Sequence, residues 1–343
     1  MVEKLNIGRS RSSARMLIGA IGVFASMSVG TALAQDQVFL NMGSTPSSSG
    51  FFTYFVSAGQ AIEKGTDGRI VVNVMETGSS VDNLRRMRRG EMEIGLSTVD
   101  VAGQAAQGVG VFADDEPWPE LRRLYLMSEV PNIYTVRVDS GVDNVEQLTG
   151  KRFNAGITGS STEAQTMDVF DVLGIKPDLY SATTGDAIAA VQDNEIIGYA
   201  KSAASVNSAD SSFMQLNTAA DVKILGLSQE QVDKVKAVHP YYSSLTVPAG
   251  VYPNQDEAVL TMGTAPGVVT TKDALSEQDA YDIVKAIIEE KQVQTDAFPS
   301  VANVDFAKLT MEQAIVPLHA GAVRYFKEIG VDVPDRLIPP EAK

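Results

Sequence analysis

Cysteine is absent from this chain of 343 residues, and histidine and tryptophan occur only twice and once. Without cysteine there is no disulfide, no thiol nucleophile, no iron–sulfur cluster and no cysteine-ligated zinc. The two histidines, His239 and His319, lie far apart in the chain, and neither stands in an H-E-x-x-H pattern. The sequence therefore gives no basis for a metal site, and we expect no metal and no cofactor.

Positive charge is also in short supply. Acidic residues outnumber lysine and arginine by 43 to 28, which gives a formal net charge of −15. Phosphate backbones repel a chain of this charge, so we expect no nucleic-acid partner.

Long apolar runs are missing except at the N-terminus, which has the three parts of a secretory signal peptide. Four basic residues precede a short apolar stretch at 16–29, and residues 32–34, Ala-Leu-Ala, form a small-x-small cleavage site. The apolar stretch is short for a bilayer span, although an uncleaved membrane anchor is the competing interpretation. We predict a signal peptide over residues 1–34, cleavage near Ala34, and a periplasmic mature protein.

The usual signatures of catalysis are absent as well. The chain contains no G-x-S-x-G, no S-x-x-K, no phosphate-binding loop and no dinucleotide fingerprint. We therefore expect a protein that is not an enzyme. Carboxylates that are distant in the sequence can still converge on one site, so a periplasmic enzyme acting on a small organic acid remains the alternative.

What is present is an alternation of apolar strand-like runs with helical patterns. Strands are expected at 38–43, 70–75, 93–96, 121–126, 133–138, 152–155, 196–200 and 268–271. Helices are expected to follow several of them, beginning near residues 51, 80, 161, 186, 277 and 320. Such alternation predicts an α/β protein with mostly parallel sheets. Ligands of these folds collect at the carboxyl ends of the strands.

Small hydroxyl-rich turns stand at three of these strand ends. They comprise residues 47–50 (Ser-Ser-Ser-Gly), 77–80 (Thr-Gly-Ser-Ser) and 160–162 (Ser-Ser-Thr). Each turn precedes a predicted helix, and Ser160 with Glu163 has the spacing of a capping box. The turns can simply cap their helices. They also present free amides and the positive end of the helix dipole, which suits a ligand carboxylate.

Two charged residues stand out beside these turns. Lys201 follows an apolar strand in an otherwise uncharged stretch, so it is either a solvated surface lysine or the partner of a ligand carboxylate. Asp100 stands at the start of a helix, where it could hold a ligand amine or cap the helix. In the helix that follows residue 160, the spacing predicts that Ala164, Met167 and Phe170 face the core.

Several segments together resemble the TAXI-type solute-binding proteins of TRAP transporters. These segments are TGSSVDNLRRMRRGEMEIGLSTVDV (77–101), DSGVDNVEQLTGKRFNAGITGSSTEA (139–164), PAGVYPNQDE (248–257) and IVPLHAGAVRYFKEIG (315–330). They occur in the expected order, and the resemblance that they carry extends over nearly all of the chain after the leader. The combination is more specific than any one segment.

The resemblance implies a two-lobe periplasmic-binding-protein type II fold with the ligand cleft between the lobes. We expect lobe one to hold residues 36–128 and 272–343, and lobe two residues 129–271. It also implies capture of a small carboxylate, such as glutamate or 2-oxoglutarate, by hinge closure. The closed protein would deliver this solute to TRAP-type membrane permease subunits. We expect a monomer.

The chain departs from the family pattern at turns that are expected to face the ligand. Serines at 44–49 replace a glycine-rich run, Thr98-Val99-Asp100 replaces Gln-Ala-Asp, and Lys201 lies where an uncharged strand end is usual. These differences point to a more oxygen-rich or doubly anionic ligand. The predicted ligand-binding residues are Ser47, Ser48, Ser49, Gly50, Thr77, Gly78, Ser79, Ser80, Thr98, Asp100, Ser160, Ser161, Thr162 and Lys201.

Overall fold

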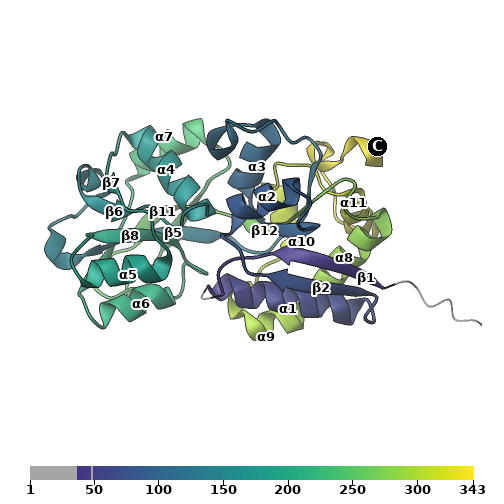
Figure 1. Ribbon diagram of the computed structural model, residues 1–343, viewed down its shortest axis with the longest axis horizontal. Coiled ribbons are helices and arrows are strands. Elements are labelled where there is room, and N and C mark those ends of the chain that lie inside the picture. Colours follow the sequence, from purple (N-terminus) through teal and green to yellow (C-terminus); the bar gives the residue numbers. More distant parts are fainter. Residues whose placement is uncertain (1–36, 48) are drawn as a thin grey trace, which may run out of the picture. The chain divides into compact units, whose positions relative to one another are not determined.

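Strands and helices alternate along the part of the chain that the structure describes (Figure 1). The structure is a computed structural model and describes residues 37–47 and 49–343. The predicted signal peptide at 1–34 lies outside these residues. The described residues belong to one compact unit that contains two β-sheets.

The first sheet has the strand order β2-β1-β3-β12-β4. Its strands are β1 (Val38–Gly43), β2 (Ile70–Met75), β3 (Ile94–Thr98), β4 (Leu121–Leu126) and β12 (Pro266–Thr271). The second sheet has the order β10-β11-β5-β8-β6-β7, and β9 also pairs with β5. Its strands are β5 (Val130–Arg137), β6 (Arg152–Asn154), β7 (Asp178–Leu179), β8 (Gly198–Ser202), β9 (Val222–Leu225), β10 (Ser243–Val247) and β11 (Val259–Thr264).

Helices cover both faces of each sheet, which confirms the predicted α/β class. The helices are α1 (Gly50–Gly65), α2 (Ser80–Arg88), α3 (Val99–Gln107), α4 (Ser161–Leu173), α5 (Thr184–Gln192), α6 (Ser211–Asn217), α7 (Gln229–Val238), α8 (Glu277–Glu289), α9 (Lys291–Ala297), α10 (Phe306–Gln313) and α11 (Ala320–Glu328). On the first sheet, α1, α8, α10 and α11 share one core, and α2 and α3 contribute to another. On the second sheet, α4 and α7 pack on one face and α5 and α6 on the other (Figure 1).

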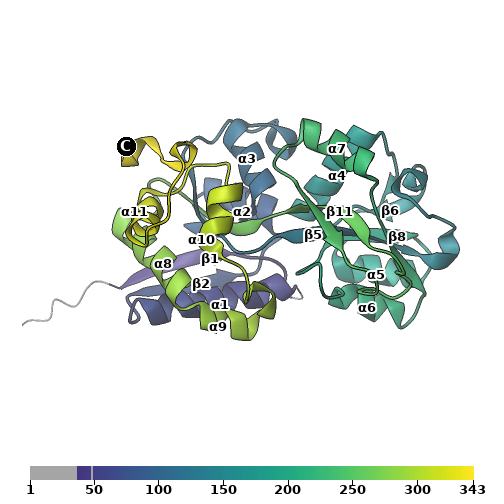
Figure 2. The ribbon, with the colours of Figure 1, turned by 180° about the vertical axis from the view of Figure 1, so that it is seen from behind.

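The prediction of mostly parallel sheets is wrong. Within each sheet, β1 is parallel to β2 and β3, and β6 is parallel to β7 and β8. The strands that connect the two sheets are antiparallel to their neighbours. The chain passes from β4 to β5 through residues 127–129 and returns from β11 to β12 through Ala265 alone. Because β11 pairs with β5 and β12 with β4, the two passages run side by side in opposite directions (Figure 2).

The division into two lobes remains a proposal. The boundary between the lobes depends on which sheet contains β12, and Pro266–Thr271 pairs with β3 and β4 of the first sheet. We therefore propose that the second lobe ends near residue 264 and that residues 265–343 belong with the first.

One helix face differs from its prediction. In α4, Ala164 and Phe170 are buried as expected, but Met167 is 37% exposed. Val169 is buried in its place, in the core that α4 shares with α7. The buried stripe thus passes through residues 165, 166 and 169, which leaves Met167 on the solvent side.

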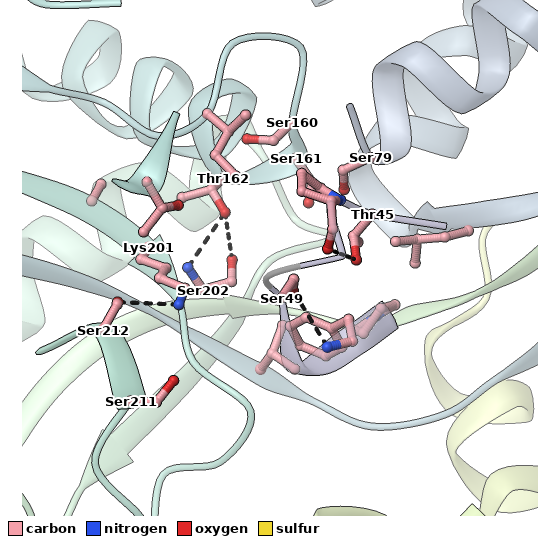
Figure 3. A pocket seen from close by; sticks show the side chains of 18 of the residues that line it. Thr45, Ser49, Ser79, Ser160, Ser161, Thr162, Lys201, Ser202, Ser211 and Ser212 are labelled. Atoms are coloured by element: carbon pink, nitrogen blue, oxygen red, sulfur yellow. Dashed lines mark hydrogen bonds between the residues drawn. The ribbon is translucent and has the colours of Figure 1, made fainter. Parts of the chain in front are cut away.

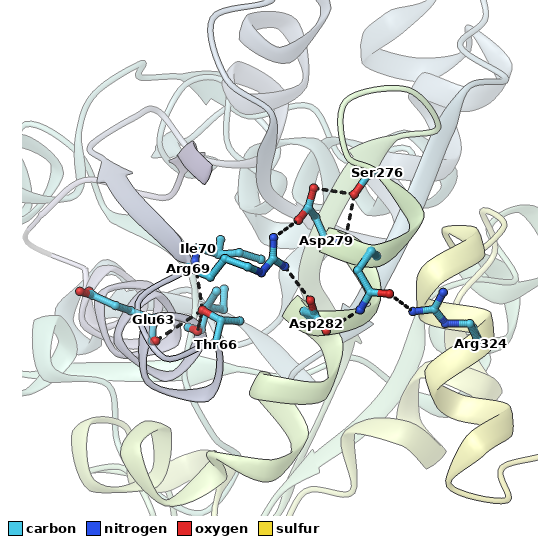
Figure 4. Close-up of polar contacts among 10 residues, drawn as sticks. Glu63, Thr66, Arg69, Ile70, Ser276, Asp279, Asp282 and Arg324 are labelled. Carbon is cyan, nitrogen blue, oxygen red and sulfur yellow. Dashed lines mark hydrogen bonds and ion pairs between the residues drawn. The ribbon is translucent and has the colours of Figure 1, made fainter. Parts of the chain in front are cut away.

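A charged clasp joins the start of β2 to α8 (Figure 4). The Arg69 guanidinium contacts Asp279 and Asp282 through separate nitrogens, each at 2.6 Å. Its side chain is only 12% exposed. On the same helix, Ser276 caps the first turn by accepting from the amide of Asp279.

Replacing Arg69 with methionine is expected to lower the free energy of unfolding by about 1.5–3 kcal/mol, because two charge-assisted hydrogen bonds of a mostly buried group are lost. Urea denaturation measures this. Lys64→Met is the control, since Lys64 pairs with Glu290 but is 63% exposed. That change should cost no more than about 1 kcal/mol. Equal losses in the two variants would contradict a structural role for the clasp.

Candidate functional site

A cavity of about 210 Å³ is lined by residues from elements of both sheets, and we call it the inter-sheet cavity (Figure 3). Most of its polar lining is hydroxyl. The hydroxyl side chains are Thr45, Ser49, Ser79, Thr98, Ser160, Ser161, Thr162, Thr184, Ser202, Ser211 and Ser212. Apolar side chains, among them Phe51, Leu96 and Ile188, supply the rest of the wall. A wall of this kind matches a small solute with several oxygen atoms.

The hydroxyls gather here because the starts of several helices meet at the cavity. Ser49, Thr98 and Ser160 are the N-cap residues of α1, α3 and α4, and Ser79 holds that position in α2. Thr184 begins α5 and also lines the cavity. The first amides of a helix have no acceptor within it, and its dipole places positive partial charge at this end. The helix starts thus bring positive partial charge to the inter-sheet cavity without a cluster of cationic side chains.

The turn before α4 is built by specific hydrogen bonds. Ser160 Oγ accepts from the amide of Glu163 at 3.2 Å. The Glu163 carboxylate accepts from the amide of Gly159 at 2.7 Å, so the predicted capping box is only half formed. Gly156 approaches this turn with a φ of +127°, and a Cβ there would lie 2.7 Å from the Glu163 amide nitrogen. Only glycine fits that position without moving the helix start.

Lys201 is neither a solvated surface residue nor a free cation. Its Nζ lies 3.1 Å from both Asp210 Oδ1 and Ser212 Oγ, and its side chain is 21% exposed. Asp210 in turn caps α6, accepting from the amides of Ser212 and Phe213. The lysine therefore lines the cavity as one half of an ion pair. The pair gives the cavity wall a fixed local dipole but no net charge.

Beside Lys201, a second contact shapes the same wall. Thr162 Oγ1 lies 2.9 Å from Ser202 Oγ and accepts from the Ser202 amide at 3.3 Å. This contact joins the first turn of α4 to the end of β8 (Figure 3). It fixes two lining hydroxyls relative to each other.

Half of the predicted ligand residues lie in the wall of the inter-sheet cavity. They are Ser49, Ser79, Thr98, Ser160, Ser161, Thr162 and Lys201. Gly50 borders a smaller adjoining hollow that shares Ser49, Phe51, Lys201 and Ser202. Ser48 lies outside the described residues. A ligand role for any of these residues remains a prediction.

The other predicted residues are occupied elsewhere. The amide and the hydroxyl of Ser47 both donate to Glu76, at 2.7 and 2.9 Å. Thr77 donates to the Ser44 carbonyl at 2.8 Å, and the Gly78 amide donates to Asp82 at 3.0 Å. Ser80 is fully buried and accepts from the Thr98 amide at 3.4 Å. These residues shape the turn beneath the cavity.

Asp100 does not cap α3, because Thr98 occupies the cap position and Asp100 lies in the first helical turn. It is fully buried and accepts from Thr264 Oγ1 at 2.6 Å. Burial raises the pKa of Asp100. The helix cap interpretation was therefore wrong, and the side chain lies outside the lining of the cavity.

Arg123 on β4 is a buried cation that supports the floor of the cavity. It is 1% exposed and donates to the carbonyls of Ser97 and Thr98 at 2.7 and 3.2 Å. Burial lowers the pKa of Arg123 to about 9, and the nearby Asp100 opposes that shift. The guanidinium therefore stays charged at neutral pH and holds the end of β3, where Thr98 lines the cavity.

A polar bridge connects the helices of the two sheets. Asp168 of α4 accepts from Tyr242 at 2.6 Å and from Gln104 of α3 at 3.0 Å. Tyr242 also lies 3.5 Å from Asp100. Burial raises the pKa of Asp168. Sequence reasoning missed this bridge, since nothing in the local pattern marks these residues.

Sequence reasoning also missed several lining hydroxyls, namely Thr45, Thr184, Ser202, Ser211 and Ser212. A signal was available for some of them. Ser211 and Ser212 directly follow Asp210, a favourable N-cap, and Thr184 follows Thr183, which caps α5. Treating every hydroxyl-rich helix start as a candidate would have found these three.

Within residues 37–47 and 49–343, no group of three or more histidine, aspartate or glutamate side chains could hold a metal ion. A search of the same residues for a membrane-crossing helix, judged by length and apolar character, finds none.

Comparison with solved structures gives matches over most of the chain. An alkanesulfonate-binding protein, SsuA from Xanthomonas axonopodis pv. citri bound to MOPS, is 14% identical with a TM-score of 0.46, over 90% of this chain and 99% of that one. A TRAP periplasmic solute binding protein from Sulfitobacter sp. NAS-14.1 with bound β-D-galacturonate is 10% identical with a TM-score of 0.45, over 85% and 94%. The GluR0 ligand-binding core from Nostoc punctiforme with L-glutamate is 10% identical with a TM-score of 0.47, over 77% and 100%.

At the level of sequence families, one model matches residues 42–330, which is most of the chain. The match includes every residue that lines the inter-sheet cavity and all strands of both sheets except the first four residues of β1. The chain belongs to the NMT1-like family.

Proposed function

We propose that this protein is the periplasmic solute-binding subunit of a TRAP-type transporter of the TAXI kind, and that it captures a small carboxylate. The observation that carries the proposal is the meeting of helix N-termini at a hydroxyl-lined cavity between the two sheets. Oriented amides and dipoles of this kind favour an anion.

The charge of the lining supports an oxygen-rich acid. Lys201 is the only charged residue among the lining residues, and it is already paired with Asp210. Neutral donors therefore outnumber ionic ones, and serine and threonine hydroxyls can both donate and accept. A small acid that carries further carboxylate, keto or hydroxyl oxygens satisfies both features. Glutamate, 2-oxoglutarate and related organic acids are of this class.

The same lining argues against the alternative of a periplasmic enzyme. General acid–base chemistry needs a titratable side chain within reach of the substrate. Among the described residues, the cavity wall contains no aspartate, glutamate or histidine, and its lysine is held in an ion pair. Binding and release fit these residues better than catalysis.

Closure of the two proposed lobes would produce the conformation that a permease recognises. The two passages between the sheets are short, so bending would be concentrated at residues 127–129 and at Ala265. A solute that contacts both walls of the cavity favours the closed form through its differential affinity. We propose that this closed form docks as a monomer on the membrane permease subunits.

A thermal-shift screen tests the ligand class. We expect at least one of L-glutamate, 2-oxoglutarate, L-malate, succinate and D-gluconate to raise the melting temperature, with D-glucose and putrescine as neutral and cationic controls. A solute at 100 times its Kd stabilises the folded state by about 2.7 kcal/mol. This corresponds to a rise of roughly 4 °C in a chain of this size. Tight binding of the sugar or the amine instead would refute the class.

Two further measurements follow with the acid that binds. Small-angle scattering should show a smaller radius of gyration with this acid, and an unchanged radius despite proven binding would argue against closure. Uptake of the acid should be lost in a strain that lacks this protein but keeps the permease. Normal uptake there would remove the transport role.

A further inference from the structure

Ser79 has an unusual backbone for a residue other than glycine. Its φ is +84° and its ψ is −157°, a region that is essentially reserved for glycine. Among the residues that the structure describes, three other non-glycine residues have positive φ, namely Asp67, Asn194 and Asn254, at 50° to 59°. Those values belong to the left-handed region that Asp and Asn tolerate. The backbone of Ser79 lies outside that region.

Hydrogen bonds on both sides hold this conformation. The amide of Ser79 donates to Thr77 Oγ1 at 3.2 Å, and its carbonyl accepts from the amide of Asn83 at 2.8 Å. Thr77 and Asn83 both donate to the carbonyl of Ser44. Asn83 is fully buried and also donates to Leu96 of β3. The turn is thus fixed to β1 and β3, and relaxation of Ser79 would disturb all of these contacts.

The hydroxyl of Ser79 has no structural task that would explain a serine here. Ser79 occupies the N-cap position of α2, yet its side chain makes no cap hydrogen bond. Among the residues that the structure describes, the hydroxyl has no hydrogen-bond partner, and Ser79 lines the inter-sheet cavity (Figure 3). Glycine would adopt the same backbone without strain and would keep both backbone hydrogen bonds.

We propose that Ser79 is a specificity-determining residue whose hydroxyl hydrogen-bonds an oxygen atom of the bound solute. The strained backbone is what places this hydroxyl in the cavity. The inference rests on the proposed function, since it needs a solute in the inter-sheet cavity. It goes further by assigning one donor, on the first-sheet wall, to the recognition of a carboxylate or hydroxyl oxygen.

Two substitutions separate the strain from the hydroxyl. Ser79→Gly removes both, whereas Ser79→Ala removes the hydroxyl and keeps the Cβ that causes the strain. Without solute, Ser79→Gly should raise the melting temperature by about 1.5–5 °C, and Ser79→Ala should not raise it. Asn194→Gly is the control, because Asn194 also has a positive φ but lies outside the cavity lining.

Calorimetric titration then uses whichever of L-glutamate, 2-oxoglutarate, L-malate, succinate and D-gluconate binds the wild-type protein most tightly. Ser79→Gly and Ser79→Ala should both weaken this binding about tenfold or more, the loss expected for one hydrogen bond to a charged group. Asn194→Gly should bind within about twofold of wild type, because it removes no contact to the solute. A more stable protein with weaker binding is the combination that the inference requires.

Two results would overturn the inference on its own. One is a Ser79→Gly protein that binds the chosen acid as tightly as wild type, and the other is a Ser79→Gly protein that is no more stable. If none of the five acids binds the wild-type protein, the proposed carboxylate function is refuted. The proposed role of the Ser79 hydroxyl is then refuted as well, because it depends on that function. The melting temperatures would then still report on the backbone strain alone.

Discussion

Replacing Arg123 with methionine is expected to lower the free energy of unfolding by about 3–5 kcal/mol, the cost of breaking a buried charge interaction from one side. The change removes one donor each from the carbonyls of Ser97 and Thr98. It also removes a buried cation that interacts electrostatically with Asp100. Because Ser97, Thr98 and Asp100 are all buried, water cannot compensate for the contacts that they lose. Chemical denaturation of the solute-free protein measures the loss.

A surface arginine provides the matched control for this experiment. Arg85 donates to the carbonyl of Val111, but its side chain is 49% exposed. Arg85→Met should therefore change the free energy of unfolding by no more than about 1 kcal/mol. Arg123→Lys keeps the charge but not the forked geometry, so an intermediate loss is expected. If Arg123→Met costs as little as Arg85→Met, Arg123 does not support the floor of the cavity.

Replacing Lys201 with methionine is expected to weaken binding of the acidic solute about 10- to 150-fold, which corresponds to roughly 1.5–3 kcal/mol. The substitution removes a donor from the wall of the inter-sheet cavity and leaves Asp210 without its cation. An uncompensated carboxylate at the edge of the cavity repels an anionic solute. Calorimetric titration with the acid found in the screen gives the affinity.

A double variant separates the loss of the lysine donor from the repulsion by the uncompensated Asp210 carboxylate. Lys201→Met combined with Asp210→Asn removes the uncompensated charge, so it should recover part of the affinity that the single variant loses. Lys223→Met is the control, because Lys223 pairs with Asp143 at a similar exposure of 20% and does not line the cavity. Affinity within twofold of wild type in Lys201→Met would show that the Lys201–Asp210 pair serves only the fold.

Much of the local structure could be predicted from the sequence. The ranges of β1, β2 and β4 match their predictions residue for residue. For β1 and β2, polar or glycine residues bound the apolar run on both sides. The start of α8 at Glu277 also matches its prediction. These features depend on residues that are neighbours in the chain, so hydrophobic periodicity and helix-cap residues are enough to predict them.

Features that depend on distant parts of the chain could not be predicted in this way. An apolar run does not reveal whether its neighbours run parallel or antiparallel, so the direction of β12 between β3 and β4 was missed. Nor does a sequence reveal which acid a lysine meets, and Asp210 was not recognised as the partner of Lys201. The φ of Ser79 is likewise set by Asn83 and Thr77 holding the turn from both sides.

The position of β12 has a consequence for how the chain folds. In the first sheet, β12 separates β3 from β4, although it is the last strand to be synthesised. Until it arrives, β4 has no strand partner in this sheet and the inner edge of β3 is open. Contacts between such remote segments slow folding, because loop closure costs entropy before pairing repays it. The first sheet therefore cannot be completed before every strand of the second has been synthesised, so the order of the chain couples the folding of the two sheets.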